Sequence, residues 1–316
     1  MVSVIYKTIN GKKYLYAEYS FRLPDGRIKK ISKLIKNKGE EKNSGAKDYF
    51  LKKQIESYQN YALETYKHNC IFDEEQIKKL EQIKVEYKEI MKSFTKNQIK
   101  DILDRFTVNF TYESNAIEGN SLTLKDVTLI LGENVVPKNK DLREVYETRN
   151  TREAHELLFK NKIKINIKDI IRAHSILVKD TGVEFGFKKL PNYLLMRNLK
   201  TTAPEKVEEE MNKLILWYES NKNKVHPLTL ASEFHAKFER IHPFDDGNGR
   251  VGRIILNAIL LEHNYPPLII RKTARIAYFS SLEAFDKGYK IKLERFLLDK
   301  IKDTFEKFFK VYVKYL

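Results

Sequence analysis

The pattern of apolar and polar positions changes partway along the chain. Over residues 3–35, apolar side chains partly alternate with polar ones, as they do in half-buried strands. The turn signals Asn10-Gly11 and Pro24-Asp25-Gly26 divide this stretch into three segments. We therefore expect a small three-stranded antiparallel sheet, followed by a stretch of linker composition over residues 37–48.

From about residue 49 onward the period is helical. Apolar residues from Leu80 to Ile90 recur at spacings of three and four, and Asp73 precedes them as a candidate N-cap. Residues 184–200 break the pattern and are expected to form a loop or short hairpin. The fold class is thus mainly α with a small N-terminal β module. Further helices are predicted at 97–118, 123–131, 141–160, 166–179, 204–221, 228–240, 250–263, 272–287 and 291–314.

The composition is that of a folded protein without a membrane span. Hydrophobic residues make up 42% of the 316, which is enough for a core, and no apolar run approaches the ~18–20 residues that a spanning helix needs. The N-terminus does not have the layout of a signal peptide. Cys70 is the single cysteine, so neither an internal disulfide nor a cysteine metal site is expected. We expect a cytoplasmic protein.

The positive charge is concentrated at the N-terminus. The chain has a net charge of +16, and residues 1–38 carry ten Lys/Arg against two acidic residues, a net +8. One interpretation is a solvated accessory module or dimer contact. A second is a nucleic-acid contact, because basic residues interleave with Tyr14, Tyr16, Tyr19 and Phe21. A third is recruitment of a protein target.

Residues 241–253 contain the densest group of chemically active side chains, Ile-His-Pro-Phe-Asp-Asp-Gly-Asn-Gly-Arg-Val-Gly-Arg, between two amphipathic helices. Gly247 and Gly249 can adopt positive-φ conformations that turn backbone N–H groups inward as an anion nest. The second helix is expected to begin near Arg250, so that its N-terminal dipole faces the same point. This arrangement suits a polyphosphate.

The side chains of this loop supply the matching chemistry. Arg250 and Arg253 lie three apart on the first helical turn and can bind phosphate in a bidentate manner. Asp246 is a hard oxygen ligand suited to Mg²⁺. His242 can act as a general base near neutral pH.

Other phosphate-binding signatures do not fit. Gly247-x-Gly249-x-x-Gly252 satisfies the dinucleotide fingerprint, but a helix precedes it where that fingerprint needs a strand. The P-loop and the protein-kinase motifs are absent.

Residues 242–253 resemble the signature of the Fic (Fido) family, His-x-Phe-x-Asp/Glu-Gly-Asn-Gly-Arg-x-x-Arg. The matching residues are His242, Phe244, Asp246, Gly247, Asn248, Gly249, Arg250 and Arg253. The resemblance implies a Fic-type helical fold with a short flap hairpin, and transfer of AMP from ATP to a Ser, Thr or Tyr hydroxyl of a protein. The target would be an unidentified protein or the chain itself.

The resemblance also implies a role for each of these positions. His242 would deprotonate the target hydroxyl, and Asp246 would bind Mg²⁺ between the α- and β-phosphates. Arg250 would bind the β-phosphate and Arg253 the γ-phosphate. Phe244 would anchor the loop in the core. Asn248 and the backbone N–H groups of Gly247 and Gly249 would also bind the phosphates.

Ser114-Asn-Ala-Ile-Glu118-Gly119 is similar to the family's inhibitory motif, Ser/Thr-x-x-x-Glu-Gly/Asn. Ser114 and Glu118 share one helix face, and Gly119 is suited to end that helix. In the family the glutamate pairs with the second arginine of the signature, here Arg253. The resemblance therefore implies an N-terminally autoinhibited enzyme.

Two further segments take their expected roles from the resemblance. Residues 184–200 stand where the family has its target-positioning flap, with Leu195, Met196 and Arg197 nearest the ligands. Arg275-x-x-Tyr278 resembles the start of the helix that closes the nucleotide pocket, with Tyr278 against the base. The predicted organisation is a basic β module at 1–45, a helical linker region at 46–106, a Fic-like catalytic domain at 107–305 with its inhibitory helix near 107–119, and a C-terminal helix end at 306–316.

Three hypotheses follow. The first is an autoinhibited protein adenylyltransferase. The second is an enzyme on the same scaffold with other chemistry, either removal of AMP or transfer of another phosphate-containing group. The third is a regulator that binds nucleic acid through residues 1–38 and whose Fic-like domain only senses nucleotide.

Overall fold

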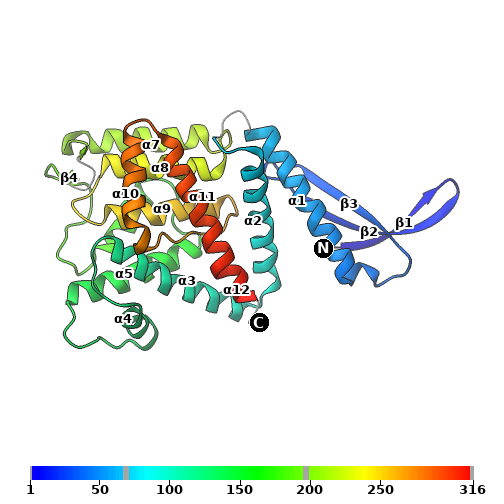
Figure 1. The fold of residues 1–316 in the computed structure, drawn as a ribbon, viewed down its shortest axis with the longest axis horizontal. Helices are drawn as coiled ribbons and strands as arrows, with labels where there is room; N and C mark the ends of the chain where they lie inside the picture. The colour runs from blue at the N-terminus through cyan, green and yellow to red at the C-terminus, as the bar shows by residue number, and fades with distance from the viewer. Residues whose placement is uncertain (1, 67–70, 195–198, 314–316) are drawn as a thin grey trace. The chain divides into compact units, whose positions relative to one another are not determined.

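The computed structural model describes residues 2–66, 71–194 and 199–313. The chain divides into two compact units, Met1–Glu89 and Ile90–Leu316 (Figure 1). Each unit is considered by itself below.

The first unit begins with the predicted antiparallel sheet. Strands β1 (Val2–Ile9), β2 (Lys12–Arg22) and β3 (Ile28–Ile35) pair in the order β1-β2-β3. Asn10 and Gly11 both have positive φ, 50° and 76°, as the tight turn between β1 and β2 requires. The prediction of a three-stranded sheet is confirmed.

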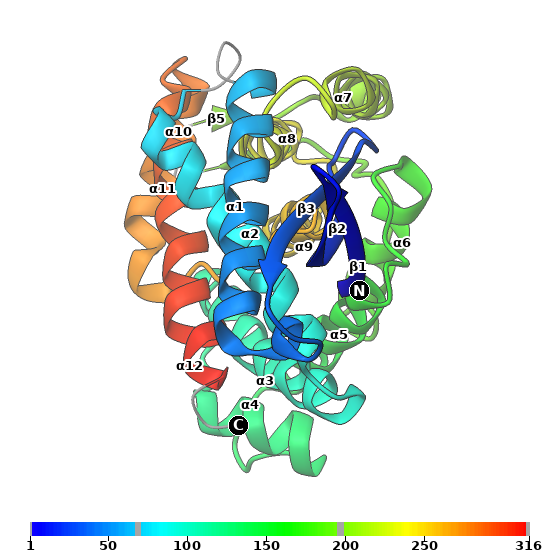
Figure 2. The ribbon, with the colours of Figure 1, turned by 90° about the vertical axis from the view of Figure 1, so that its right-hand side faces the viewer.

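Helix α1 (Ser44–Tyr66) covers one face of this sheet (Figures 1 and 2). Ala46 and Phe50 of α1 pack on Ala17 and Ile35 in a buried apolar cluster. The expected linker over residues 37–48 is therefore shorter than predicted, because a 3₁₀ turn, η1 (Glu40–Lys42), and the first turn of α1 lie within it. Burial of Ala46 explains this difference, since tertiary packing outweighs the polar local composition.

Helix α2 (Glu74–Ser93) begins where the sequence predicts. The Asp73 carboxylate accepts a hydrogen bond from the backbone N–H of Gln76 at 2.8 Å. The Gln76 side chain in turn accepts one from the backbone N–H of Asp73 at 3.1 Å. Asp73 is thus the N-cap in a reciprocal capping arrangement.

The second unit is helical, apart from a hairpin of β4 (Tyr193–Leu194) and β5 (Leu199–Lys200) inside the expected loop at 184–200. Two predicted helices change character along their length: 123–131 becomes a short α-helix followed by a π-helical turn, and 291–314 contains a second π-helical turn. The helices and helical turns are α3 (Lys96–Ile117), α4 (Leu124–Thr128), η3 (Leu129–Glu133), α5 (Leu142–Phe159), α6 (Ile167–Leu177), η5 (Pro204–Lys206), α7 (Val207–Asn221), α8 (Pro227–Ile241), α9 (Asn248–Glu262), η6 (Lys272–Ala274), α10 (Arg275–Asp286), α11 (Lys290–Thr304), η7 (Phe305–Phe309) and α12 (Lys310–Val313).

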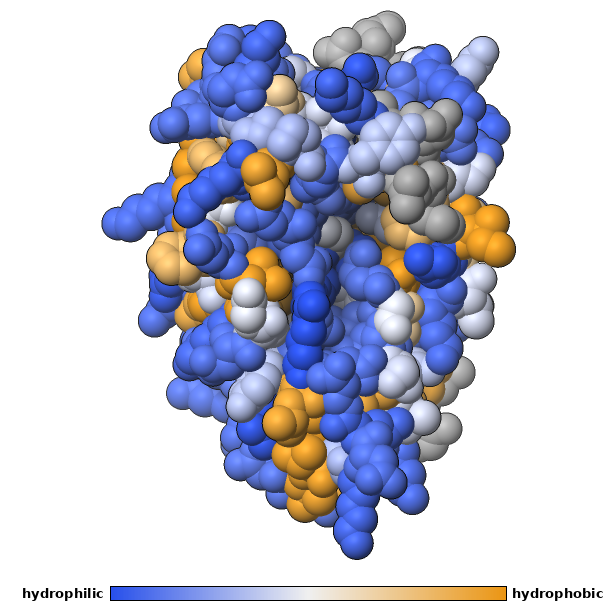
Figure 3. All heavy atoms as spheres, turned by 90° about the vertical axis from the view of Figure 1, so that its left-hand side faces the viewer, coloured by the Kyte–Doolittle hydropathy of each residue, from blue (hydrophilic) through white to orange (hydrophobic). Residues whose placement is uncertain are grey.

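Helix α9 lies at the centre of this unit. It contacts α8, α6, α5 and α3, and most of its side chains are buried (Figures 1 and 2). The loop between His242 and Gly247 is therefore fixed by two packed helices, α8 before it and α9 after it. The face in Figure 3 is predominantly hydrophilic, with smaller groups of apolar side chains. Among the residues that the structure describes, no helix is both long and apolar enough to cross a membrane.

Candidate active site

The loop between α8 and α9 is bounded by two residues in the left-handed conformation. His242 caps α8 with φ 51° and ψ 63°, and Gly247 precedes α9 with φ 80°. A positive φ at a histidine is uncommon and strained, and such residues cluster at functional sites. Helix α9 begins at Asn248, slightly before the predicted start near Arg250. Gly249 therefore lies in the first helical turn and does not adopt the positive φ expected from the sequence.

Phe244 anchors the loop in the core, as the resemblance implies. Its buried ring stacks on His174 of α6, with ring centroids 3.8 Å apart and planes 1° from parallel. His174 Nε2 lies 3.0 Å from the backbone carbonyl oxygen of Asp246, and His174 Nδ1 accepts a hydrogen bond from the N–H of Gly186 at 3.3 Å. Burial lowers the pKa of His174 to about 4, so the ring is neutral and donates one N–H to Asp246.

Asn248 maintains the shape of the loop with both ends of its amide. Its Oδ1 accepts from the N–H of Phe244 at 2.9 Å, and its Nδ2 donates to the carbonyl of Phe244 at 2.8 Å. The side-chain contact to phosphate expected for Asn248 would have to replace one of these bonds. The backbone N–H groups of the first turn of α9 have no partner within the helix and face its N-terminal end.

Arg253 is buried and lies against the end of α3. Its Nη1 is 2.8 Å from Oε1 of Glu118, the pairing that the resemblance implies. Its Nε donates to Oγ of Ser114, and its Nη2 donates to the backbone carbonyl of Ser114, both at 2.9 Å. Burial alone would lower the pKa of Arg253, but the charge of Glu118 outweighs it and the guanidinium remains charged.

Gly249 is required by this ion pair. A Cβ placed on Gly249 would collide with the Glu118 carboxylate and crowd Nη1 of Arg253. The close approach of a charged side chain to the backbone thus explains this glycine, where the sequence suggested a positive φ.

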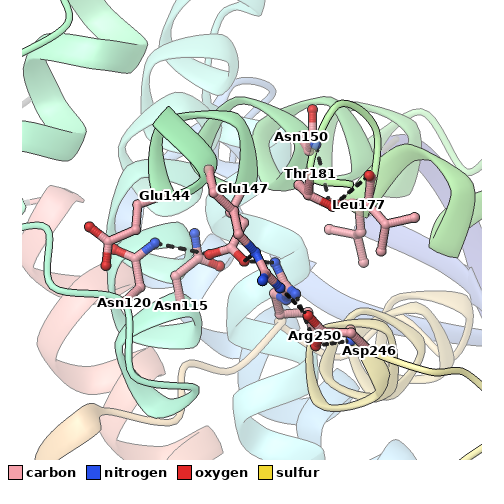
Figure 4. Close-up of polar contacts among 12 residues, drawn as sticks. Asn115, Asn120, Glu144, Glu147, Asn150, Leu177, Thr181, Asp246 and Arg250 are labelled. Atoms are coloured by element: carbon pink, nitrogen blue, oxygen red, sulfur yellow. Dashed lines mark hydrogen bonds and ion pairs between the residues drawn. The ribbon is translucent and has the colours of Figure 1, made fainter. Parts of the chain in front are cut away.

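Arg250 belongs to a second network, which the sequence did not predict (Figure 4). Its Nη1 lies 3.2 Å from Oε1 of Glu147 on α5, and its Nη2 lies 3.5 Å from Oδ1 of Asp246. Arg143, one turn before Glu147, forms an ion pair with Oδ2 of Asp246 and approaches Glu147 with Nε at 3.4 Å. Asn120, just after the inhibitory motif, donates to Oε2 of Glu147 at 3.1 Å.

A pocket of about 250 Å³ opens beside the loop. Its lining includes His242, Gly249, Arg253 and Glu118, and Tyr278 and Phe279 of α10 contribute aromatic rings. Tyr278 is buried, and its hydroxyl is 2.6 Å from Nε2 of His235. The predicted flap residues Leu195, Met196 and Arg197 lie outside the described part of the chain.

Lys188 supports the loop between α8 and α9 through both its backbone and its side chain. Its backbone N–H donates to the carbonyl of Pro243 at 2.8 Å. Its buried ammonium group lies 2.7 Å from Thr201 Oγ1, 2.8 Å from Asn192 Oδ1 and 3.5 Å from the carbonyl of Ile241. No signal in the sequence distinguishes Lys188, Arg143 or Glu147 from surface charges, because their roles depend on tertiary packing.

The donor set of the loop suits Mg²⁺ better than a transition metal. Asp246 offers one partly exposed carboxylate, and no cluster of three or more His, Cys, Asp or Glu side chains able to hold a metal occurs among residues 2–66, 71–194 and 199–313. Mg²⁺ usually binds through one or two carboxylates together with substrate phosphates and water. Asp246 beside a polyphosphate would meet this requirement.

The fold and the loop define a Fic-type domain, and comparison with known proteins agrees. Residues 164–260 match the model of the Fic/DOC family. This chain is 34% identical over 183 residues to protein adenylyltransferase Fic of Nematostella vectensis. The matching stretch covers 56% of this chain and 43% of that protein. The chain is 31% identical over 186 residues to protein adenylyltransferase fic-1 of Caenorhabditis elegans, covering 57% and 36%. The chain thus spans less than half the length of these curated relatives.

Solved structures show the same fold. A Fic domain-containing signaling protein of Bacteroides thetaiotaomicron superposes with a TM-score of 0.68 at 23% identity, covering 74% of this chain and 97% of that one. A fragment of Fic-1 from C. elegans gives a TM-score of 0.64 at 22% identity, covering 74% and 73%. The predicted fold class is confirmed.

Proposed function

We propose that the chain is an adenylyltransferase that transfers AMP from ATP to a protein hydroxyl and that Glu118 inhibits it. The observation that carries the proposal is the shared pocket: His242, Arg253, the first turn of α9 and Glu118 all border one cavity. The names of the curated relatives support this chemistry. The target protein would be recognised next to His242.

In the proposed reaction the target hydroxyl gives its proton to the imidazole of His242. The hydroxyl oxygen then attacks the α-phosphorus of ATP, the bond to the β-phosphate breaks, and pyrophosphate leaves. Arg250, Arg253 and the N–H groups at the start of α9 stabilise the phosphate charge and position the α-phosphorus for in-line attack. Asp246 would hold Mg²⁺, which when bound neutralises part of the phosphate charge.

The proposed inhibition is supported by the geometry of Arg253. Nη1 of Arg253 lies 2.8 Å from the carboxylate of Glu118, so a phosphate must displace this carboxylate before it can bind the same nitrogen. Two carboxylate- or phosphate-type anions cannot share one position without strong repulsion. The resting enzyme therefore binds ATP in a form unsuited to transfer.

Incubation with ATP labelled at the α-phosphate tests this proposal. Glu118→Gly is expected to give strong protein labelling, one AMP in mass, with weaker labelling of wild type and none of His242→Ala. Equal labelling of wild type and Glu118→Gly would remove the inhibitory role. Label retained in His242→Ala would remove the proposed base.

A second candidate is the reverse chemistry, removal of AMP from a modified protein. It is favoured by the position of the Glu118 carboxylate in the same pocket as His242, where it can orient a water molecule. Release of AMP from an adenylylated protein by wild type, and its loss in Glu118→Gly, would establish this activity.

A further inference from the structure

The N-terminal sheet has one covered face and one open face. Strand register places Leu15, Ala17, Tyr19 and Phe21 of β2 on the face that packs toward α1. The intervening residues of β2 and their partners on β1 and β3 lie on the other face, where most side chains are partly or fully exposed. Cations and aromatic rings gather on this open face. They are Lys7, Lys12, Tyr14, Tyr16, Arg22 and Lys30.

The positive charge of residues 1–38 is only partly balanced, with ten Lys/Arg against two acidic residues. Glu18, at the centre of the open face, lies 3.7 Å from Lys7 and 4.0 Å from Lys30. The other acidic residue of this segment, Asp25, pairs with Arg27 in the turn between β2 and β3. Lys12, on the open face, has no acidic group within ion-pair distance among the described residues. The same holds for Lys13 and Lys29, which lie on the other face of the sheet. Unbalanced charge of one sign is the footprint expected for a polyanionic partner.

The dimensions of the sheet indicate which kind of polyanion fits its open face. Two inter-strand spacings of about 4.8 Å place the axes of the outer strands about 10 Å apart, and the major groove of B-DNA is about 12 Å wide. The eleven residues from Lys12 to Arg22 on β2 span about 33 Å, close to one turn of duplex. The major groove of A-form RNA is too narrow for such an element.

One of the two aromatic rings on the open face, Tyr16, is not free for base stacking, which disfavours single-stranded nucleic acid. Binding of single strands depends on aromatic faces that are free for base stacking. The ammonium of Lys7 lies 5.0 Å from the centroid of the Tyr16 ring and occupies that face. By contrast, Ile28 and Leu34 are 58% and 56% exposed on the same side of the sheet, where apolar groups can contact thymine methyl groups.

We propose that the open face of the β1-β2-β3 sheet binds duplex DNA in the major groove, with Lys7, Lys12, Arg22 and Lys30 on phosphates. This binding is separate from the proposed adenylyl transfer and involves none of the residues assigned to it. It would bring the Fic domain to DNA-associated proteins.

Fluorescence anisotropy of the full chain with a labelled duplex of about two helical turns tests the proposal. Between about 50 and 200 mM salt, four phosphate contacts predict a slope of log Kobs against log salt of about −4. In Lys12→Gln/Arg22→Gln/Lys30→Gln the slope is expected to fall in magnitude by about 3, with at least a ~10-fold loss of affinity at low salt. Glu18→Gln, which removes the central acid, is expected to bind about two- to fivefold more tightly.

The control is Lys160→Gln/Lys287→Gln/Lys307→Gln, which removes the same net charge from exposed side chains of the second unit. It is expected to change DNA affinity less than about twofold, and thermal unfolding checks that both variants fold. Equal weakening by the two triple variants would overturn the proposal, as would absence of binding at the lowest salt. Tighter binding of duplex RNA, single-stranded DNA or an acidic peptide would also overturn it.

Discussion

The carboxylate of Glu147 lies 3.2 Å from the guanidinium of Arg250, with side chains only 13% and 4% exposed. Each of these two arginines of α9 thus faces a carboxylate from earlier in the chain, Glu147 of α5 for Arg250 and Glu118, the C-cap of α3, for Arg253. The two pairs differ in position. Glu118 lines the pocket, whereas Glu147 contacts one edge of Arg250 and leaves Nη2 directed at Asp246. We infer that Glu147 orients Arg250 for its ligand.

Glu147→Gln is therefore expected to weaken ATP binding, by about three- to tenfold. The amide keeps the shape of the side chain but loses the charge that orients a buried guanidinium, and hydrogen bonds to charged groups contribute about 1.5–3 kcal/mol. Isothermal titration calorimetry with a non-hydrolysable ATP analogue measures the change. Glu144→Gln on the same helix is the control, because Glu144 binds Ser121 and not Arg250. Unchanged or tighter binding in Glu147→Gln would contradict the orienting role.

Arg143 forms an ion pair with the carboxylate assigned to Mg²⁺. Both side chains are partly exposed, 48% for Arg143 and 41% for Asp246, so the pair is weak enough to be displaced. Arg143→Gln is expected to lower the Mg²⁺ concentration that half-saturates binding of the ATP analogue, by up to about fivefold, since exposed ion pairs contribute ~0.2–1 kcal/mol.

The matched control for this variant is Arg149→Gln on the same helix, because Arg149 bonds Asn134 and not Asp246. It is expected to leave the Mg²⁺ dependence unchanged. A higher Mg²⁺ requirement in Arg143→Gln, or weaker binding of nucleotide at every Mg²⁺ concentration, would show that Arg143 binds phosphate and does not compete with the metal.

Local sequence features predicted much of the fold and the centre of the site. The apolar periodicity located the sheet and the helices, because strands and helices each have their own spacing of apolar residues along the chain. The N-cap Asp73 could also be predicted, because it depends on contacts only three residues apart. The motif of residues 242–253 is likewise local, so its residues could be assigned together. Glu118 was found only through a second motif, and its approach to Arg253 is now seen at 2.8 Å.

The remainder of the site depends on contacts between distant segments. Arg143 and Asp246 are 103 residues apart, and no local pattern joins them. Lys188 resembles its exposed neighbour Lys189 in the sequence, yet only Lys188 is buried beneath the loop. The two π-helical turns, η3 and η7, also escaped prediction, because their hydrogen-bond register is not encoded by apolar spacing.

Ser114 accepts two hydrogen bonds from Arg253, one at Oγ and one at the backbone carbonyl. Ser114→Ala removes the first, so Arg253 becomes less firmly held against α3. We expect AMP transfer intermediate between that of wild type and Glu118→Gly, and a lower unfolding temperature, because a buried hydrogen bond to a charged group is lost. The measurements are labelling by α-labelled ATP and thermal unfolding.

The comparison variant for Ser114→Ala is Thr111→Val, close to Ser114 on the same helix. Thr111 is buried, and its Oγ1 has no hydrogen-bond partner in the described structure. A valine of similar shape is expected to leave AMP transfer unchanged. If Ser114→Ala transferred AMP no faster than Thr111→Val, Ser114 would have no part in the inhibition.

Lys188 makes the stability of the loop depend on pH. Burial lowers the pKa of Lys188 from 10.5 to about 8, whereas the unfolded chain keeps the ordinary value. Between these two values the unfolded state binds more protons, so the free energy of unfolding rises with pH. Lys188→Met lacks this titration, and the difference in unfolding free energy, wild type minus variant, is expected to increase from pH 8 to 10.5. Chemical denaturation across that range measures this difference.

The control is Lys189→Met, which should show no such increase with pH, because Lys189 is exposed and its pKa is raised by Glu184. If the difference in unfolding free energy between wild type and Lys188→Met does not change with pH, the ammonium of Lys188 is solvated and does not support the carbonyl of Ile241 beside His242.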